Sequence, residues 1–178
     1  IFFGFSINNF IFLVIFLNFL IFFFLFLYFL IFKFLFEIIK KGSDLTIVSY
    51  GSTLRIVEQA AKELLEVDIE VEIIDIQSLI PFDLQKDISK SVEKTNRLLI
   101  VDEDVPGGAS AYILNQILEH QNIYQNLDSK PQVLTAKEHR PAYGTDGDYF
   151  SKPSADDVFE KVYNMFHEVD PSSFPKLR

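Results

Sequence analysis

Three consecutive carboxylates, Asp102, Glu103 and Asp104, stand after an apolar run and before Gly107 and Gly108, which let the chain turn sharply. Such a group of acidic side chains can bind a cation or receive the basic surface of a partner. A metal site would need further ligands at helical or loop spacing, and the sequence shows none, so we predict no metal-binding residues. The triplet is interpreted as a candidate partner-docking loop, with an ordinary solvated loop as the alternative.

One histidine, His139, is next to a cationic residue, Arg140, in the sequence. The loop that follows also contains Tyr143, Asp146, Asp148 and Tyr149. A general base needs an oriented partner and a substrate within hydrogen-bond reach. The pattern supplies neither, so packing against a neighbouring domain is favoured over catalysis.

The other chemical signals are weak. His120 and His167 fit surface or packing positions. The chain has no Cys, which excludes thiolate chemistry, and it has no Ser-His-Asp order, zinc-helix motif or Walker pattern. The turn Gly51-Ser52-Thr53 could face an anion but fits a strand-to-helix turn better. We therefore predict no catalytic residue and no cofactor-binding residue in this chain.

The sequence predicts strands and helices in alternation, and these elements would position the acidic loop and the histidine loop. Helices are expected after the turn Gly51-Ser52-Thr53, which offers an N-cap hydroxyl, after Asp83, which would cap the second helix, and after a capping box formed by Ser154 and Asp157. Their apolar faces include Leu65 and Leu84. Short apolar runs predict strands at 45–50, 71–75, 97–101 and, more weakly, 132–135. This alternation indicates an α/β fold with a mostly parallel sheet covered by helices on both faces.

Composition divides the chain. Residues 1–36 hold 15 of the 20 Phe and a single charge, Lys33, whereas the rest carries 15 basic and 25 acidic residues. An acidic domain is a poor binder of phosphate backbones, so nucleic acid is excluded as a partner. We expect a hydrophobic segment at 1–36, a globular domain at 37–170 and a C-terminal tail at 171–178.

The apolar head has three interpretations. Its uncharged run, residues 1–32, is long enough for a membrane-spanning helix flanked by Lys33, Lys40 and Lys41. Its Phe, Ile, Leu and Asn content is also typical of translated A/T-rich, low-complexity DNA, and a buried helix is the third reading. Because the chain begins at Ile1, we expect a fragment or a processed product. A membrane partner and a membrane location are expected only if the head is genuine.

Several blocks carry a family resemblance: Gly42–Gly51, Val71–Asp83, Ser89–Arg97 and the turn from Glu103 to Gly108. In them the chain resembles the C-terminal domain of the transketolase-like β component of thiamine diphosphate-dependent 2-oxo acid dehydrogenases, of the pyruvate and branched-chain 2-oxoisovalerate types. The loop 140–150 is similar to a branch in which α and β parts are fused in one chain.

The resemblance implies a three-layer α/β/α domain with a five-stranded sheet that has one antiparallel strand. It implies a parent enzyme that oxidatively decarboxylates a 2-oxo acid on thiamine diphosphate and Mg²⁺ and passes the acyl group to a lipoyl arm. The family's cofactor-binding and catalytic residues lie in preceding domains, so this chain alone is expected to be inactive and to bind neither cofactor.

The expected partners are those decarboxylating α and β domains and a dihydrolipoyl acyltransferase core, in an oligomer that is cytoplasmic. Glu103 matches an acidic position of the family, which favours the docking interpretation. The alternatives are a membrane-anchored, non-catalytic binding module and a fragment of another transketolase-like enzyme.

Overall fold

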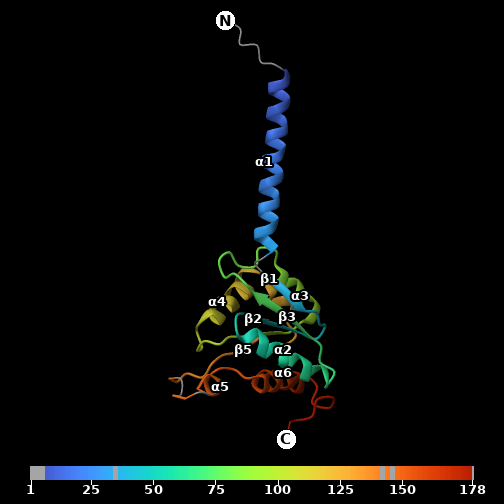
Figure 1. Ribbon diagram of the computed structural model, residues 1–178. Coiled ribbons are helices and arrows are strands. Elements are labelled where there is room, and N and C mark those ends of the chain that lie inside the picture. Colours follow the sequence, from blue (N-terminus) through green and yellow to red (C-terminus); the bar gives the residue numbers. More distant parts are fainter. Residues whose placement is uncertain (1–6, 34–35, 141–142, 145–146, 178) are drawn as a thin grey trace. The chain divides into compact units, whose positions relative to one another are not determined.

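The computed structural model describes residues 7–33, 36–140, 143–144 and 147–177 of the chain (Figure 1). The chain divides into two compact units, residues 1–35 and residues 36–178, and each is described by itself.

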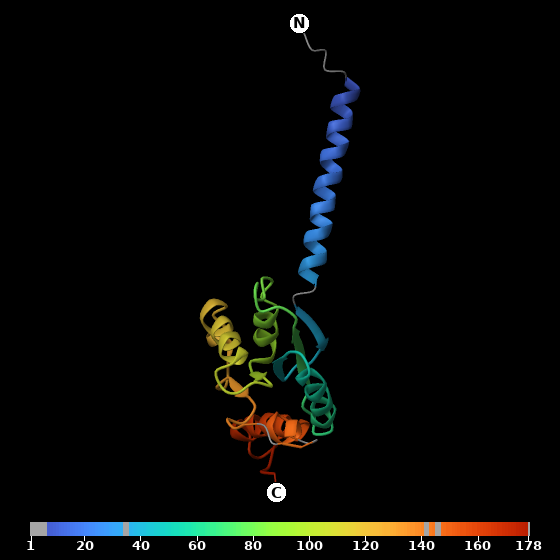
Figure 2. The ribbon, with the colours of Figure 1, turned by 60° about the vertical axis from the view of Figure 1, so that its left-hand side comes forward.

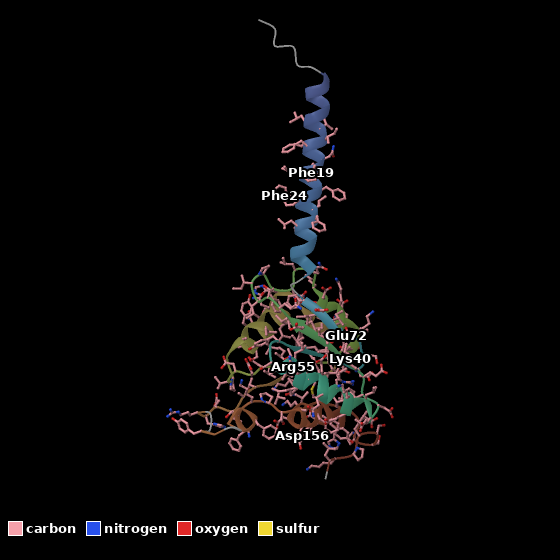
Figure 3. The ribbon with its side chains drawn as sticks, viewed as in Figure 1. Phe19, Phe24, Lys40, Arg55, Glu72 and Asp156 are labelled. Carbon is pink, nitrogen blue, oxygen red and sulfur yellow. The ribbon has the colours of Figure 1, made fainter. Side chains whose placement is uncertain are left out.

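The first unit contains one helix, α1 (Ile7–Lys33). Its described side chains, at 13–28, are almost all apolar, and Phe19 and Phe24 project from the helix in Figure 3. Asn18 turns its amide back to donate to the Val14 carbonyl at 2.9 Å, which satisfies this polar group within the helix. Over the described residues, no helix combines the length and apolarity needed to cross a membrane.

The second unit is built on a five-stranded mixed sheet with the strand order β1-β3-β2-β4-β5 (Figure 1). Strand β1 pairs antiparallel with β3, and all other pairings are parallel. The strands are β1 (Phe36–Lys40), β2 (Leu45–Ser49), β3 (Val71–Ile76), β4 (Leu98–Val101) and β5 (Gln132–Leu134). The predicted α/β class and the single antiparallel strand are confirmed.

The burial of the central strands β2 and β4 shows why their apolar residues form a sheet. Every residue of β2 and of β4 is buried, as expected for strands that carry helices on both faces. The edge strand β1 was not recognised from the pattern, because its first residue, Phe36, closes the apolar run of the head. In the structure Phe36 belongs to the sheet and packs its ring edge-on against Phe82, with 5.4 Å between ring centroids.

Two helical layers cover the sheet. On one face, α2 (Thr53–Leu65) and α6 (Ala155–Val169) share a core with side chains such as Ile47 and Ile73. On the other face, α3 (Asp87–Thr95) and α4 (Ala109–Asn115) pack on Val48, Ile74 and Ile100. Figure 2 shows α3 in green and α4 in yellow together on one side. Consecutive strand residues point to opposite faces, so the two cores alternate along each strand. The predicted three-layer arrangement is confirmed.

Short helical segments complete this unit. A π-helix, η1 (Gln116–His120), continues directly from α4, and a 3-10 turn, η2 (Ile123–Asn126), leads toward β5. The short helix α5 (Gly147–Ser151) precedes α6.

The predicted helix caps have mixed outcomes. The capping box of Ser154 and Asp157 is present, with both reciprocal hydrogen bonds. Asp83 caps α3 from a distance, since its two carboxylate oxygens accept the N–H groups of Asp87 at 2.8 Å and Ile88 at 3.0 Å. The hydroxyl cap expected from Gly51-Ser52-Thr53 is wrong. The N-cap residue Ser52 makes no capping bond and donates to Glu103 instead, and the Thr53 hydroxyl donates to the Tyr50 carbonyl.

Two residues predicted on apolar helix faces are exposed. Leu65 lies at the solvent side of the last turn of α2. Leu84 precedes α3, because that helix begins three residues later, at Asp87. The remaining apolar periodicity of α3 is correct, with Ile88 and Val92 fully buried.

The C-terminal segment folds back on α6. Phe174 packs its ring against Tyr163 and Phe166, with centroids 5.9 and 5.3 Å apart. The Tyr163 hydroxyl donates to the Pro175 carbonyl at 3.0 Å, and a ring nitrogen of His167 lies 2.7 Å from the Phe174 carbonyl. We call residues 170–175 the C-terminal strap.

Candidate functional site

Asp102 follows β4 and is fully buried at the carboxyl edge of the sheet. One of its carboxylate oxygens accepts the Tyr50 hydroxyl and the Asp104 N–H, and the other accepts the Ser110 N–H at 2.8 Å. Tyr50 directly follows β2, and Ser110 lies in the first turn of α4. Asp102 therefore joins the ends of two adjacent strands to the start of a helix.

This environment holds Asp102 in its charged form. Burial alone would raise the pKa of the Asp102 carboxyl, but the hydrogen bonds from Tyr50, Asp104 and Ser110 outweigh it and lower the pKa below the ordinary value. The pKa of Tyr50 moves the other way: burial, and then the bond to Asp102, raise it well above its usual value. At neutral pH the pair is a carboxylate and a neutral phenol.

Glu103 turns outward and connects three segments. Its Oε2 atom accepts the Ser52 hydroxyl at 2.6 Å and the Lys152 ammonium at 3.2 Å. Hydrogen bonds from Ser52 and then Lys152 lower the pKa of the Glu103 carboxyl, so it too is charged at neutral pH. About a third of each side chain of the Glu103–Lys152 pair is exposed, which leaves the carboxylate within reach of a partner.

Asp104 is exposed and ends the acidic triplet. Its side chain accepts the Val105 N–H at 2.8 Å, and its carbonyl accepts the Ala136 N–H at 2.9 Å. Gly107 has φ +95°, a conformation that favours glycine. A Cβ atom on Gly108 would lie 2.6 Å from Oδ2 of Asp104, so the carboxylate folds closely over that glycine.

The three predicted docking residues thus separate into two roles. Asp102 lies inside, where it organises the loop and is inaccessible to a partner surface. Only Glu103 and Asp104 reach the outside. The candidate docking surface is therefore the pair Glu103–Asp104, and Asp102 is its internal support.

A groove adjoins this loop. It has a volume of about 390 Å³ and lies between the start of α2 and the segment that joins α5 to α6. Two of its lining residues, Ser52 and Lys152, are the residues bonded to Glu103. The remaining lining residues are Ile56, Gln59, Tyr149, Pro153, Ser154, Ala155 and Asp156.

The histidine loop has a different character. A ring nitrogen of His139 lies 2.9 Å from the Arg140 carbonyl, and its ring lies 5.7 Å from the Phe150 ring. Arg140 lies over the Tyr143 ring, and Lys137 lies over that of Phe150. These are cation–aromatic packing contacts rather than an acid–base pair. Asp146 falls outside the described residues, as does the side chain of Asp148.

In the part of the chain that the structure describes, no group of three or more His, Asp or Glu side chains could hold a metal ion.

Sequence reasoning missed the residues that shape the loop from outside it. Tyr50 and Asp102 directly follow two strands, β2 and β4, that are neighbours although β3 comes between them in the chain. In a doubly wound sheet, the functional crevice lies where the strand order reverses, which here is between β2 and β4. This rule could have pointed to the loops that follow these two strands. Nothing in the spacing points to Lys152, which lies 49 residues from Glu103.

A comparison with protein families decides the family. The family model described as "Transketolase, C-terminal domain" matches residues 36–153. The chain belongs to this family. The match begins at β1, the strand that the pattern had missed, and ends just before the capping box of α6.

Curated relatives of this transketolase C-terminal domain are dehydrogenase subunits. It is 37% identical over 127 residues to a pyruvate dehydrogenase E1 component subunit beta from Mesostigma viride, covering 71% of this chain and 38% of that protein. It is 43% identical over 84 residues to the mitochondrial 2-oxoisovalerate dehydrogenase subunit beta 2 of Arabidopsis thaliana, covering 47% of this chain and 23% of that protein. The chain thus spans well under half the length of these relatives.

Solved structures share the fold at lower identity. A split-gene transketolase, described as an inactive β4 tetramer, superposes with a TM-score of 0.57 at 23% identity, over 73% of this chain and 40% of that one. A transketolase from Pichia stipitis gives 0.53 at 15% identity, over 78% of this chain and 19% of that one. These likenesses establish the fold alone.

Proposed function

We propose that this chain is the C-terminal assembly and docking domain of the β component of a thiamine diphosphate-dependent 2-oxo acid dehydrogenase. In this proposal the oxidative decarboxylation and the acyl transfer to a lipoyl group take place on the enzyme's other domains. This domain packs against those decarboxylating α and β domains and presents Glu103 and Asp104 to the dihydrolipoyl acyltransferase core.

One observation carries the proposal: the 37% identity over 127 residues to a pyruvate dehydrogenase E1 subunit beta. Transketolases of known structure, matched over 73% and 78% of this chain, share only 23% and 15% identity with it. The dehydrogenase β component is therefore favoured over the other transketolase-like enzymes.

The geometry of the acidic loop supports the docking role. Buried Asp102 fixes the loop through bonds to Tyr50 and Ser110, so the Glu103 backbone is held by the fold. A carboxylate that is charged, partly exposed and held in place loses little freedom when a cation binds to it. That combination favours recognition of a basic segment.

Two expectations remain proposals. Relatives named as mitochondrial and chloroplastic include the 2-oxoisovalerate dehydrogenase subunit of Arabidopsis thaliana and a pyruvate dehydrogenase subunit of Oryza sativa. Their names describe those proteins, and the cytoplasmic location of this chain stays a prediction. Its assembly into an oligomer is likewise proposed.

The docking role is tested by surface plasmon resonance between the full chain and a dihydrolipoyl acyltransferase, at low and at high salt. Glu103→Lys should weaken binding about tenfold and flatten its salt dependence, because it reverses the charge at the contact. Glu160→Lys makes the same change on the exposed face of α6 and serves as the matched control. Equal affinities of Glu103→Lys and the unchanged chain at low salt would contradict the docking role.

The placement of the chemistry is tested by isothermal titration of the full chain with thiamine diphosphate and Mg²⁺. We expect no binding heat, because in this proposal the cofactor sits on other domains. Micromolar affinity for the chain alone would overturn that assignment.

A further inference from the structure

The Glu103–Lys152 pair spans the boundary between the acidic loop and the groove of about 390 Å³ beside it. Lys152 comes from the segment that joins α5 to α6, and its ammonium lies 3.2 Å from Oε2 of Glu103. Its side chain also lines the groove. The Lys152 ammonium of this chain therefore already binds the Glu103 carboxylate, which the proposed function assigns to docking.

The groove has the composition that a long cationic side chain requires. Ile56, Pro153 and Ala155 supply apolar wall for an aliphatic stem, and Tyr149 supplies an aromatic face at its edge. Ser52 and Gln59 offer polar atoms. The described lining therefore combines an apolar surface with hydrogen-bonding groups near a carboxylate.

Once Lys152 has left Glu103, the carboxylates in and beside the groove favour a cationic occupant. Asp156, in the first turn of α6, lines the groove, and Glu103 and Asp104 lie at the adjoining loop (Figure 3 labels Asp156). Lys152 is the one cation among the described lining residues. Arg55, also labelled in Figure 3, belongs to α2 but is not a lining residue.

We infer that this groove receives a lysine or arginine side chain of a basic partner segment, and that Lys152 is an internal competitor which the partner displaces from Glu103. The inference rests on the proposed docking function and adds the position and the regulation of the contact. The exchange costs little free energy, because a partly exposed ion pair contributes little to stability. Glu103 keeps its Ser52 bond during the exchange, so its carboxylate stays oriented.

The competition is tested by fluorescence anisotropy with a labelled oligo-arginine peptide and the full chain at low salt. Lys152→Met removes the competing ammonium but keeps the length of the side chain. It should tighten binding about two- to fivefold, the amount that corresponds to a partly exposed ion pair. Glu103→Gln should weaken binding, and adding Lys152→Met to that variant should give no tightening, because the two residues act through one contact.

Matched variants separate competition from a general change of charge. Lys161→Met makes the same substitution on α6, where Lys161 lines a different groove. Arg55→Gln removes a cation from α2 outside the groove lining. If either variant tightens binding as much as Lys152→Met, or if the tightening persists with Glu103→Gln, internal competition is wrong.

The design also distinguishes the inference from the function on which it rests. Peptide binding that Glu103→Gln leaves unchanged would remove the docking role itself. Weakening by Glu103→Gln together with no effect of Lys152→Met would remove only the competition. Circular dichroism at matched temperatures confirms that each variant is folded, and partly or fully exposed positions such as these are expected to tolerate the changes.

Discussion

The Tyr50 hydroxyl donates a hydrogen bond to the Asp102 carboxylate and thereby ties the end of β2 to the end of β4. The two residues are 52 positions apart in the chain, and the loops that follow them carry Ser52 and Glu103, which are also bonded to each other. The outer contact of the candidate site therefore depends on an inner one, in which a buried carboxylate holds the loop from which Glu103 projects.

Replacing Asp102 should lower stability strongly, because three donors lose their acceptor in a buried place. Asp102→Ala leaves the Tyr50 hydroxyl and the N–H groups of Asp104 and Ser110 unsatisfied, and we expect a loss of about 3 kcal/mol in the free energy of unfolding. Tyr50→Phe removes one donor and its bond and should cost about 1 kcal/mol. Urea denaturation followed by circular dichroism measures both, and equal losses would contradict the central position of Asp102.

Acid should weaken the fold partly through the same carboxylate. The pKa of Asp102 is lowered in the folded chain relative to an unfolded value near 4, so the unfolded state binds the proton more readily. The stability that this group contributes is present above about pH 4 and is lost as the pH falls through the folded pKa. Asp102→Asn cannot titrate there. The difference in unfolding free energy between the unchanged chain and Asp102→Asn should shrink as the pH falls from about 5 to 2.5, and a constant or growing difference would refute this.

Local signals predicted much of the fold because they depend on neighbours in the chain. The buried strand at β2 and the capping box at Ser154 each follow from a few adjacent residues. The Ser52 cap failed for the opposite reason. A carboxylate 51 residues away, on Glu103, competes for the Ser52 hydroxyl, and that contact exists only after the sheet has formed.

The acidic loop shows the same limit at the candidate site. Composition alone treats three successive carboxylates as equivalent and exposed, since unpaired acidic residues are almost never buried. Asp102 is buried because Tyr50 and Ser110 reach it from other elements, and their donors compensate its charge. Glu103, the next residue, is partly exposed and bonds to Ser52 and Lys152 instead. The sequence supports an acidic loop, and only the tertiary contacts show which member is accessible.

Glycine positions provide a third prediction. A Cβ atom on Gly42 would lie 2.2 Å from the Val71 carbonyl carbon, within the backbone of β3, whereas on Gly108 it would meet only the movable Asp104 side chain. Gly42→Ala must therefore shift the backbone between β1 and β2 and should cost about 3 kcal/mol or more, while Gly108→Ala should cost about 1 kcal/mol. Thermal unfolding of the two variants measures the contrast, and similar melting temperatures would show that the close approach at Gly42 is absent.

The C-terminal strap supports a final prediction, because one aromatic ring, that of Phe174, anchors it beside its hydrogen-bond contacts with Tyr163 and His167. Phe174 packs on Tyr163 and Phe166. Arg97 lies over the Phe166 ring, with its guanidinium carbon 4.5 Å from the ring centroid. Phe174→Ala removes these ring contacts and should cost about 2 kcal/mol, a value below that of a fully buried Phe since the ring is only partly buried.

Phe174→Ala should loosen the end of α6 locally as well as lower the global stability of the fold. Without the ring, the strap should also release the Phe174 and Pro175 carbonyls from His167 and Tyr163, so amide exchange in the last turns of α6 should quicken while exchange in β2 follows global stability. Tyr124→Ala, which removes a ring that is 75% exposed, is the matched control and should change neither quantity. If Phe174→Ala leaves exchange in α6 unchanged, the strap does not depend on its aromatic anchor, and the two carbonyl contacts suffice to hold it.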